Sequence, residues 1–311
     1  MTITRLAILL LCFISVTSCK VSYKKNINPD IGAGFGGGGG GGDWTGSGVY
    51  LNAKVCLEGA VNPLSVLPLE MVYTLNTNQT LPYITPYTLA APWLHYSASD
   101  IALNPFIYDD GDPSTGGWVD WVLVEVYSYN YGYYAKVDAQ SALLYWDGRL
   151  FNTSGQQGLF FSTLLPGDYY INIKHRNHLA IANQTAVSLT VQSQLDFDTN
   201  VFELDFTNVL TITTGATATV AGNQCMLAGD VNSDNTIDSI IDLGLLNTQV
   251  DSIFPSAVHN TTLNGYFSTD TNFDGTIKKD TAVTPSTPDH SLIIANDSQT
   301  TVVHPNAPAP P

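Results

Sequence analysis

Two short acidic loops near the C-terminus place the strictest limit on how this chain can fold. The first runs from Asp230 to Asp238 (DVNSDNTID), and the second runs from Asp270 to Ile277 (DTNFDGTI). Each loop has Asp, Asn and Asp at positions 1, 3 and 5, a spacing at which side-chain oxygens converge on one Ca²⁺ when the backbone wraps around it. Both segments must therefore turn back on themselves, and we predict two calcium sites.

The other positions of each loop agree with a cation site. Position 6 has to turn sharply, and it is Asn235 in the first loop and Gly275 in the second, residue types that tolerate a left-handed backbone. The carbonyl at position 7 is the usual next ligand, and the aliphatic residue at position 8 is expected in the core. The predicted loop ligands are Asp230, Asn232, Asp234, Thr236, Asp238, Asp270, Asn272, Asp274 and Thr276.

The closing carboxylate departs from a standard loop. Position 12, where a bidentate carboxylate normally completes the shell, is Ile241 in the first loop and Thr281 in the second. Asp242 comes one residue late, whereas Asp280 comes one residue early and Asp289 lies farther along the chain. We predict that Asp242 and Asp289 close the loops. Acidic turns without metal are the alternative, which is disfavoured because so many unpaired carboxylates would repel one another.

The segment around the loops differs in composition from the rest of the chain. Residues 227–299 hold ten Asp against Lys278 and Lys279, a net charge of −8. Between the loops, apolar residues from Ile241 to Phe254 recur at helical spacing, so a short amphipathic helix is expected there. We therefore assign residues 223–299 to a separate calcium-loop module with short helices.

The segment before this module has the pattern of a β-rich domain. Runs rich in Val, Tyr, Leu and Phe alternate with Gly, Pro, Asn and Asp clusters, and no 3.6-residue apolar period persists before residue 239. We predict a mainly β fold, with a β-sandwich over residues 44–222. The clearest strands are expected at 49–57, 118–129, 143–146, 158–162, 169–175 and 186–191.

The N-terminus carries an export signal. Arg5 precedes an apolar run, Leu6 to Val16, that is too short to span a membrane as a helix. The sequence VTSC, ending at Cys19, resembles the lipobox of bacterial lipoproteins, in which the cysteine becomes the acylated mature N-terminus. The resemblance implies a signal peptide at 1–18, a lipidated Cys19 and an outer-membrane or cell-surface location, since Lys20 rather than aspartate follows. Ordinary cleavage without a lipid is the alternative.

Residues 19–43 and 300–311 are expected to lie outside any core. The stretch GAGFGGGGGGG at 32–42 behaves as a flexible tether, and the tail from 300 is rich in proline. The chain has 11 Lys and Arg against 27 Asp and Glu, a net charge of −16. We therefore expect no nucleic-acid partner, because phosphate contacts need a basic patch.

Apart from Cys19, the exported chain has two cysteines, Cys56 and Cys225. An oxidising exterior would let them pair, although cysteine is also among the most buried residue types. The sequence leaves a disulfide and two buried thiols equally open.

No pattern in the chain indicates an active site, and we predict a non-catalytic protein. The histidines of His175-Arg176-Asn177-His178 would face opposite sides of a continuing strand and could not chelate one ion. Arg176 is expected to pair with a buried acid such as Glu125. Asp120 and Glu125 could be the two carboxylates of a glycosidase, but a turn residue and an ion-pair partner are favoured. Asp109–Asp112 is expected to form an ordinary turn.

A tyrosine-rich hairpin tip is a candidate ligand surface. In the sequence YSYNYGYY, strand alternation places Tyr127, Tyr129, Tyr131 and Tyr133 on one face. Such a face suits stacking against a sugar or a partner protein. Packing of the face against a neighbouring sheet or loop is the alternative, and the sequence favours neither.

The acidic loops carry a family resemblance. GDVNSDNTIDSIIDLGLL (229–246) resembles the first repeat of a type I dockerin, and the second loop is similar to the degenerate repeat of a dockerin-like family of bacterial surface proteins, often labelled haemagglutinins. The preceding domain shares LEGAV (57–61), WVDWVLVEV (118–126), ALLYWDGRL (142–150) and YYINIKHRNHLAI (169–181) with that family. The resemblance implies a fold and a location more than an activity. True dockerins bind cohesins through two near-symmetric repeats, and the repeats here are unequal.

These observations together predict a lipid-anchored, calcium-binding adhesion or assembly module at the cell surface. Its partner would be a surface protein or a glycan. The alternative is a glycan-binding lipoprotein of a polysaccharide-utilisation system. The sequence leaves the identity of the partner and the oligomeric state open.

Overall fold

The computed structural model describes most of the chain beyond residue 47. The described residues are 48–65, 67–95, 100–102, 116–191, 204–208, 217–255, 257, 261–279 and 287–300. All of them belong to one unit, Gly46–Pro311, which is separate from Met1–Thr45. The predictions for the signal peptide, Cys19, the tether, the Asp109–Asp112 turn, Asp280 and the Pro-rich tail fall outside the described residues. Among the described residues, none of the helices has the length and apolar character needed to span a bilayer.

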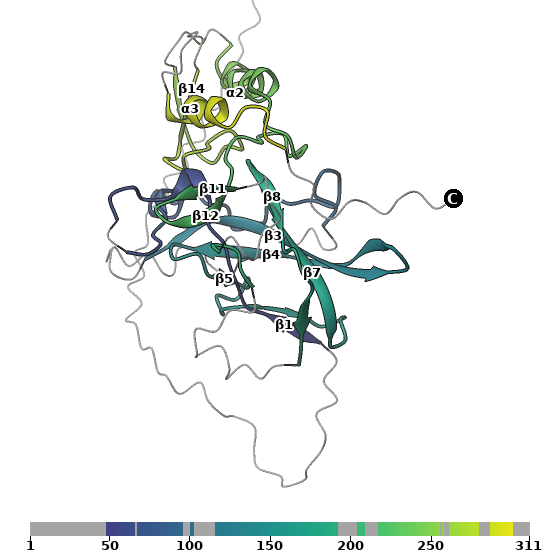
Figure 1. The fold of residues 1–311 in the computed structure, drawn as a ribbon. Coiled ribbons are helices and arrows are strands. Elements are labelled where there is room, and N and C mark those ends of the chain that lie inside the picture. The colour runs from purple at the N-terminus through teal and green to yellow at the C-terminus, as the bar shows by residue number, and fades with distance from the viewer. Residues whose placement is uncertain are drawn as a thin grey trace, which may run out of the picture. The chain divides into compact units, whose positions relative to one another are not determined.

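A six-stranded antiparallel sheet forms the centre of the fold (Figure 1). Its strands pair in the order β5-β4-β3-β7-β8, and β9 pairs with β7. The central strand is covered on both faces, because ten successive residues from Trp118 to Tyr127 are buried. The bounds are β3 Trp118–Asn130, β4 Tyr133–Tyr145, β5 Leu150–Phe151, β7 Gly167–His175, β8 His178–Ala182 and β9 Val187–Leu189.

Four two-stranded sheets accompany the large one, so the fold is mainly β, as predicted. Three pairs are antiparallel, and the pair β2–β10 is parallel. They are β1 Val49–Leu51 with β6 Leu159–Phe161, β2 Ala53–Lys54 with β10 Leu204–Asp205, β11 Thr217–Val220 with β12 Asn223–Met226, and β13 Thr262–Asn264 with β14 Thr276–Lys278.

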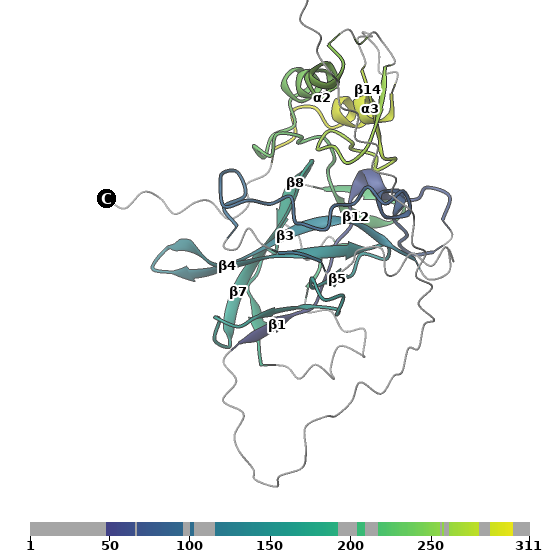
Figure 2. The ribbon, with the colours of Figure 1, turned by 180° about the vertical axis from the view of Figure 1, so that it is seen from behind.

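Helices are few among the described residues. A 3₁₀ turn spans Glu58–Ala60 and α1 spans Thr74–Thr77. The predicted helix between the acidic loops is α2, Ser239–Ile253, and a further helix, α3, spans Pro288–Ala295. Figure 2 shows α2, α3 and β14 lying together, and Val250 of α2 packs on Ile277 of β14 in a small buried cluster.

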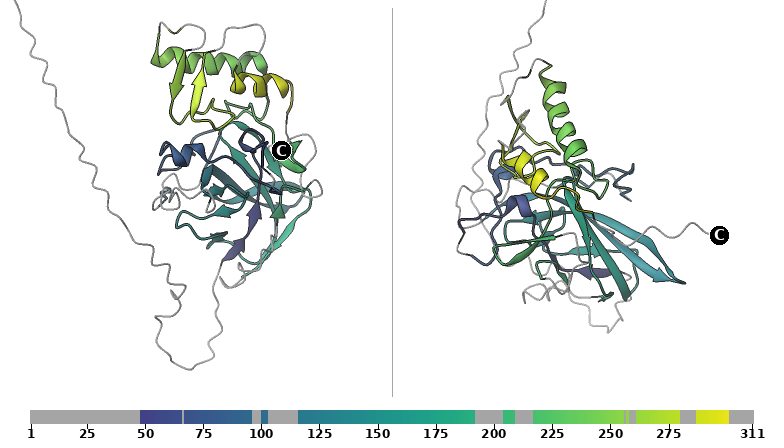
Figure 3. Two further views of the ribbon diagram at one scale, coloured as in Figure 1. Left: turned by 90° about the vertical axis from the view of Figure 1, so that its left-hand side faces the viewer. Right: turned by 45° about the horizontal axis from the view of Figure 1, so that its top comes forward.

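The strand predictions include neither β8 nor the short strands β10 to β14, and they differ from the structure along β4. Only 143–146 was predicted there, whereas the strand begins at Tyr133 and pairs with β3 as a long hairpin that projects from the sheet (Figure 3). The first half of β4 is half-exposed and carries Lys136, Asp138 and Gln140, so its sequence lacks the apolar signal on which the prediction relied. The predicted strand at 49–57 is likewise divided into the short strands β1 and β2.

One continuous core joins the large sheet to the acidic loops. Ile237, Leu246 and Phe273, from the segment assigned to the calcium-loop module, lie in the same buried cluster as Trp118 and Trp121 of β3. The predicted boundary between residues 222 and 223 falls inside the β11–β12 hairpin. The loops are therefore packed as part of the β-rich body.

Cys56 and Cys225 form a disulfide, which decides between the two alternatives left by the sequence. Both residues are fully buried, and the bond joins positions 169 residues apart in sequence. Beside it, the Met226 N–H donates to the Cys56 carbonyl at 2.8 Å. The bond thus fixes the N-terminal strands to the chain that leads into the first acidic loop.

Replacing both cysteines, Cys56→Ala with Cys225→Ala, is expected to lower the free energy of unfolding by about 2–5 kcal/mol, because the bond closes a long loop in the unfolded chain. Guanidinium unfolding of the variant and of the oxidised protein would measure the difference. Reduction of the unsubstituted protein serves as the control and should give a similar loss. Coincident unfolding curves for all three would contradict the prediction.

Candidate metal centre

The first acidic loop closes around Asp230. This carboxylate is buried and accepts hydrogen bonds from the backbone N–H groups of Asp234 and Asn235, both at 3.0 Å. The Asn232 Oδ1 accepts from the Asp234 N–H at 3.0 Å, and the Asn232 Nδ2 donates to the Asp234 Oδ2 at 2.9 Å. The side chains at positions 1, 3 and 5 therefore gather at one place inside the loop.

The second loop repeats this construction around Asp270. The buried Asp270 accepts the Gly275 N–H on Oδ2 at 3.1 Å. The Asn272 Nδ2 donates to the Asp274 Oδ2 at 3.0 Å, and the Asp274 N–H donates to the Asn272 Oδ1 at 3.3 Å. The other oxygen of Asp270, Oδ1, is buried without a hydrogen-bond partner among the described residues. A buried carboxylate oxygen without a donor fits a cation ligand.

Both loops use a left-handed backbone at the same two positions. Position 6 has φ 67° at Asn235 and 76° at Gly275, as the sequence predicted. Position 4, which the sequence did not single out, has φ 59° at both Ser233 and Phe273. Non-glycine residues in this region are uncommon, so the matching backbone marks the loops as two copies of one local structure.

The two predicted closing carboxylates reach back into their loops from the first turn of α2 and of α3. Asp242 accepts the N–H of Val231 at 3.2 Å and that of Asp238 at 2.8 Å. Asp289 accepts the N–H of Thr271 at 2.8 Å. Val231 and Thr271 both hold position 2, so the two buried carboxylates occupy equivalent places despite their different sequence spacing.

The remaining predicted ligands have local contacts of their own. The N–H groups of Thr236 and Thr276 donate to Oδ1 of the aspartate at position 5, at 2.9 and 2.7 Å. Asp238 is the N-cap of α2, and its Oδ1 accepts from Ile240 at 2.8 Å and Ile241 at 3.1 Å. This cap explains why the helix starts directly after the loop. Among the described residues, no three His, Cys, Asp or Glu side chains converge as a complete metal-binding group.

Burial raises the pKa of four loop carboxyl groups. The pKa is about 7 for Asp230, about 6 for Asp242, about 8 for Asp270 and about 7 for Asp289. Desolvation is the largest cause in each case, and neighbouring loop carboxylates raise the values further. At neutral pH the metal-free loops therefore hold carboxyl groups that ionise only at a cost in stability, and a divalent cation would remove that cost.

The raised pKa values predict that calcium stabilises the protein more at pH 8 than at pH 5. A carboxyl group whose folded pKa exceeds the unfolded value of about 3.9 contributes stability below that value and loses it as the pH rises through the folded pKa. Melting temperatures with EGTA and with calcium should therefore diverge as the pH rises from 5 to 8. Burial lowers the pKa of His175 and His178, so these histidines make the protein more stable as the pH rises, in EGTA and in calcium alike. The difference between the melting temperatures in the two buffers therefore reports on the carboxyl groups alone. A difference independent of pH would contradict the assignment.

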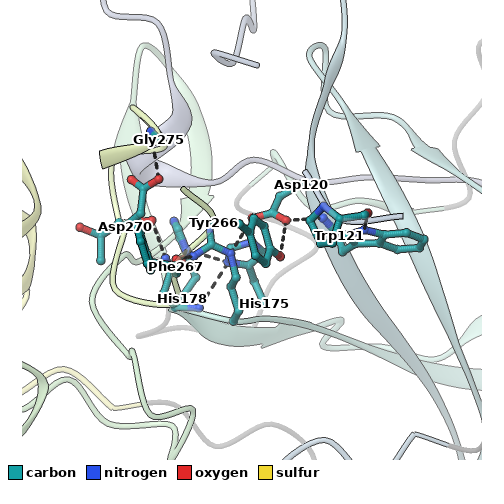
Figure 4. Close-up of polar contacts among 12 residues, drawn as sticks. Asp120, Trp121, His175, His178, Tyr266, Phe267, Asp270 and Gly275 are labelled. Carbon is teal, nitrogen blue, oxygen red and sulfur yellow. Dashed lines mark hydrogen bonds and ion pairs between the residues drawn. The ribbon is translucent and has the colours of Figure 1, made fainter. Parts of the chain in front are cut away.

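The turn between β7 and β8 joins the loops to the large sheet (Figure 4). The Arg176 Nε donates to the Asp120 Oδ2 at 2.8 Å, and the Tyr266 hydroxyl donates to the Asp120 Oδ1 at 2.8 Å. The Arg176 guanidinium also lies 4.5 Å from the centre of the Tyr266 ring and donates to the Phe267 carbonyl. One arginine therefore contacts the central strand and the segment leading into the second loop.

The prediction that Arg176 pairs with a buried acid is confirmed, but Glu125, the acid named as an example, is not its partner. Arg176 pairs with Asp120, which lies in β3 and is not a turn residue, whereas Glu125 pairs with Lys136 at 3.1 Å and Lys174 at 3.2 Å. Side chains alternate along a strand, so Asp120 and Glu125 point to opposite faces of β3, and only Asp120 faces the turn. For the same reason the two carboxylates do not face each other across a cleft, as a glycosidase pair would.

The two histidines of the turn lie side by side, contrary to the prediction. The strand does not continue through them, because β7 ends at His175 and β8 begins at His178. Their Nδ1 atoms are 3.1 Å apart, and the His175 Nε2 lies 3.2 Å from the Asp120 Oδ2. Phe273 of the second loop packs on both rings, at centroid distances of 5.5 and 5.6 Å. The pair belongs to the buried contact between turn and loop.

The side chain of Asn177 and main-chain carbonyls of the turn contact both acidic loops. The Asn177 Nδ2 donates to the Asp270 carbonyl at 2.7 Å, and the Asn177 carbonyl accepts the Gly229 N–H at 2.8 Å. The Ser233 hydroxyl donates to the Arg176 carbonyl at 3.4 Å. The polar cluster in a strand-like run was the sequence signal for this turn, and its role as a support for the loops was missed.

Removing the arginine, Arg176→Met, is expected to lower the free energy of unfolding by about 3–5 kcal/mol, since it leaves a buried carboxylate unpaired. Adding Asp120→Asn should recover a large part of the loss, because the uncompensated charge is then gone. Urea unfolding would measure the free energy of unfolding of both variants. The matched control is Lys278→Met, because Lys278 forms no ion pair among the described residues. A loss for Arg176→Met no larger than for the control would contradict this role.

The β3–β4 hairpin tip does not form the predicted four-tyrosine face. Tyr129 lies opposite Tyr134, whereas Tyr133 lies opposite Asn130 and so points to the other face. Tyr131 is in the turn and is fully exposed. A two-residue turn pairs odd positions with even ones, which is why the alternation does not carry through it.

The tyrosines on the Tyr129 face pack against one another. The Tyr134 ring lies 4.8 Å from the Tyr129 ring, tilted by 51°, and 5.0 Å from the Tyr170 ring, at 90°. Tyr170 belongs to β7, so these contacts of ring faces and edges join the hairpin to the neighbouring strand.

Comparison with known proteins gives no relative: no family model, no curated protein and no solved structure matches this chain. The resemblance to dockerin-like surface proteins rests on the quoted motifs alone.

Proposed function

We propose that this protein is a calcium-binding adhesion or assembly module of the bacterial cell surface, lipid-anchored and non-catalytic. The single observation that carries the calcium assignment is the matched construction of the two acidic loops. In each loop an Asp-x-Asn-x-Asp core, left-handed residues at positions 4 and 6 and a buried carboxylate from the next helix come together. Independent acidic turns would have no reason to share all three features.

The donor set fits a hard cation. The side chains of each loop offer carboxylate, amide and hydroxyl oxygens, which suit Ca²⁺, and no sulfur or imidazole. Asp230, Asn232, Asp234 and Asp242 would hold one ion, and Asp270, Asn272, Asp274 and Asp289 would hold the other. The bound cation would neutralise carboxylates that the fold has buried.

The proposed role of calcium is structural. Phe273 and Ile237 of the loops are fully buried in the core that includes β3, so the loops cannot open without disturbing the sheet. Sites of this kind in extracellular modules bind in the millimolar range, and a ligand bound to the native state alone stabilises it. We further propose that β1 and β6 cover the large sheet as part of a β-sandwich, and that the loops with α2 and α3 form a dockerin-like module.

The anchoring and location rest on the sequence. The lipobox-like VTSC ending at Cys19 and the glycine-rich tether support a folded body held away from an outer-membrane surface. The surface partner, a protein or a glycan, would bind the β-rich body or the loop region without being chemically altered.

Calcium is expected to raise the melting temperature, and substitution of the closing carboxylates should remove this response. At a hundredfold excess over Kd, one site adds about 2.7 kcal/mol to the free energy of unfolding. The double variant Asp242→Asn with Asp289→Asn should melt at a temperature independent of calcium.

The matched control is Asp251→Asn in α2 of the same region. Asp251 is half-exposed and pairs with Lys279, and an ion pair near the surface contributes only about 0–1 kcal/mol. The control should keep the full calcium response in differential scanning calorimetry. A chelator that leaves the melt of the unsubstituted protein unchanged, or a double variant that responds like the control, would contradict the proposal.

A further inference from the structure

A cleft of about 380 Å³ opens beside β2, at the turn that follows β4. Leu67, Pro68 and Leu69 form one wall, and the remaining lining residues are Lys54, Trp146, Asp147 and Arg149. The volume lies within the range of small-molecule sites, and an apolar wall with a few polar groups is their usual composition. None of these residues takes part in the acidic loops or in the Asp120–Arg176 contact.

Two cations lie side by side in this cleft. Lys54 and Arg149 face each other as an antiparallel bridge pair, an arrangement in which like charges destabilise a sheet. Arg149 is compensated by Asp147, at 2.7 Å, and also donates to the Gln157 side chain at 3.1 Å. The Lys54 ammonium forms no ion pair or hydrogen bond with any described residue. The cleft therefore carries two positive charges against one negative charge.

A positive cleft is exceptional in this chain. The net charge is −16, and cations are scarce. Within the described part of the chain, every Lys and Arg other than Lys54 and Lys278 forms an ion pair with an acid. Lys278 lies in β14 and lines no part of this cleft. The unpaired charge of Lys54 thus coincides with a recess, which points to an anionic ligand.

Trp146 forms the aromatic wall of the cleft and lies close to the backbone at Gly116. A Cβ at Gly116, where φ is +68°, would lie 1.8 Å from the Trp146 indole, so this glycine lets the backbone approach the ring closely. The backbone N–H of Trp146 donates to the Gly117 carbonyl at 3.0 Å, and the Trp146 carbonyl accepts the Met71 N–H at 2.8 Å, so hydrogen bonds fix the main chain that carries the indole. A side chain on a fixed main chain costs less ordering entropy on binding, and the apolar face of an indole suits a ring-shaped ligand.

We propose that this cleft binds one residue of an acidic saccharide, with its acidic group beside Lys54 and Arg149 and the apolar face of its ring on Trp146. A simple inorganic anion would not use the indole, and a neutral sugar would not use the unpaired ammonium. The inference extends the proposed surface role by naming a ligand class for it. It does not depend on calcium, because no loop residue lines the cleft.

Isothermal titration of the full-length protein with an oligogalacturonate and with its methyl ester tests the charge requirement. The ester keeps the sugar ring and removes the carboxylate charge. We expect the acid to bind about tenfold or more tightly than the ester, since a charge-assisted hydrogen bond is lost. A sulfated oligosaccharide of similar length forms a third arm, and preference for it over the oligogalacturonate would assign sulfate as the acidic group. Equal affinity for acid and ester, or no binding of either acidic sugar at millimolar concentration, would overturn the proposal.

The variant Lys54→Gln, with Lys278→Gln as the matched control, tests the position of the site. Lys54→Gln should weaken binding of the acidic sugar about tenfold, and Lys278→Gln should leave it unchanged. Far-UV circular dichroism and the calcium-dependent melt would show that both variants are folded. The affinity of the unsubstituted protein should also fall with added salt, a measurement that needs no variant. Equal effects of the two substitutions would overturn the site, whereas failure of the calcium proposal would appear only in the melts.

Discussion

The buried ion pair between Asp120 and Arg176 is the interaction on which the rest of the structure depends. Asp120 lies in the central strand of the large sheet, and Arg176 lies in the turn that meets the acidic loops. Burial alone would raise the pKa of Asp120, but Arg176 and His175 lower it to about 2, so both partners stay charged. A buried charge pair of this kind is costly to break, since either partner alone would be left uncompensated.

This pair also links the loops to the core. Arg176 contacts the residues before the second loop through the Tyr266 ring and the Phe267 carbonyl, and its charge lowers the pKa of Asp270 against the larger effect of burial. Phe273 packs on the histidine pair of the same turn. Calcium bound to the proposed sites would therefore act on the same packed unit as the ion pair, which supports the structural role that we propose for the cation.

Basic side chains are scarce in this chain, and this decides which acidic groups have a basic partner. Two lysines converge on the buried Glu125, one arginine holds Asp120, and the loops keep their carboxylates without any basic side chain of their own. In such an acidic chain, buried carboxylates without a basic partner indicate places for a metal ion. A basic side chain without an acid, as at Lys54, indicates a place for an anion. The two proposed ligand classes thus arise from one imbalance of charge.

The sequence by itself determined the features that depend on local spacing. These are the mainly β character, the helix after the first loop, the left-handed position 6 and the two carboxylates that return to the loops. Only the tertiary structure decided the partner of Arg176, the neighbouring histidines, the Cys56–Cys225 disulfide and the division of the tyrosines between two faces. Each of these depends on where a turn falls or on which distant strands pair. The alternation of side chains along a strand and the amino-acid composition cannot specify the position of a turn or the pairing of distant strands. Turn position and strand pairing are fixed only when the sheet assembles.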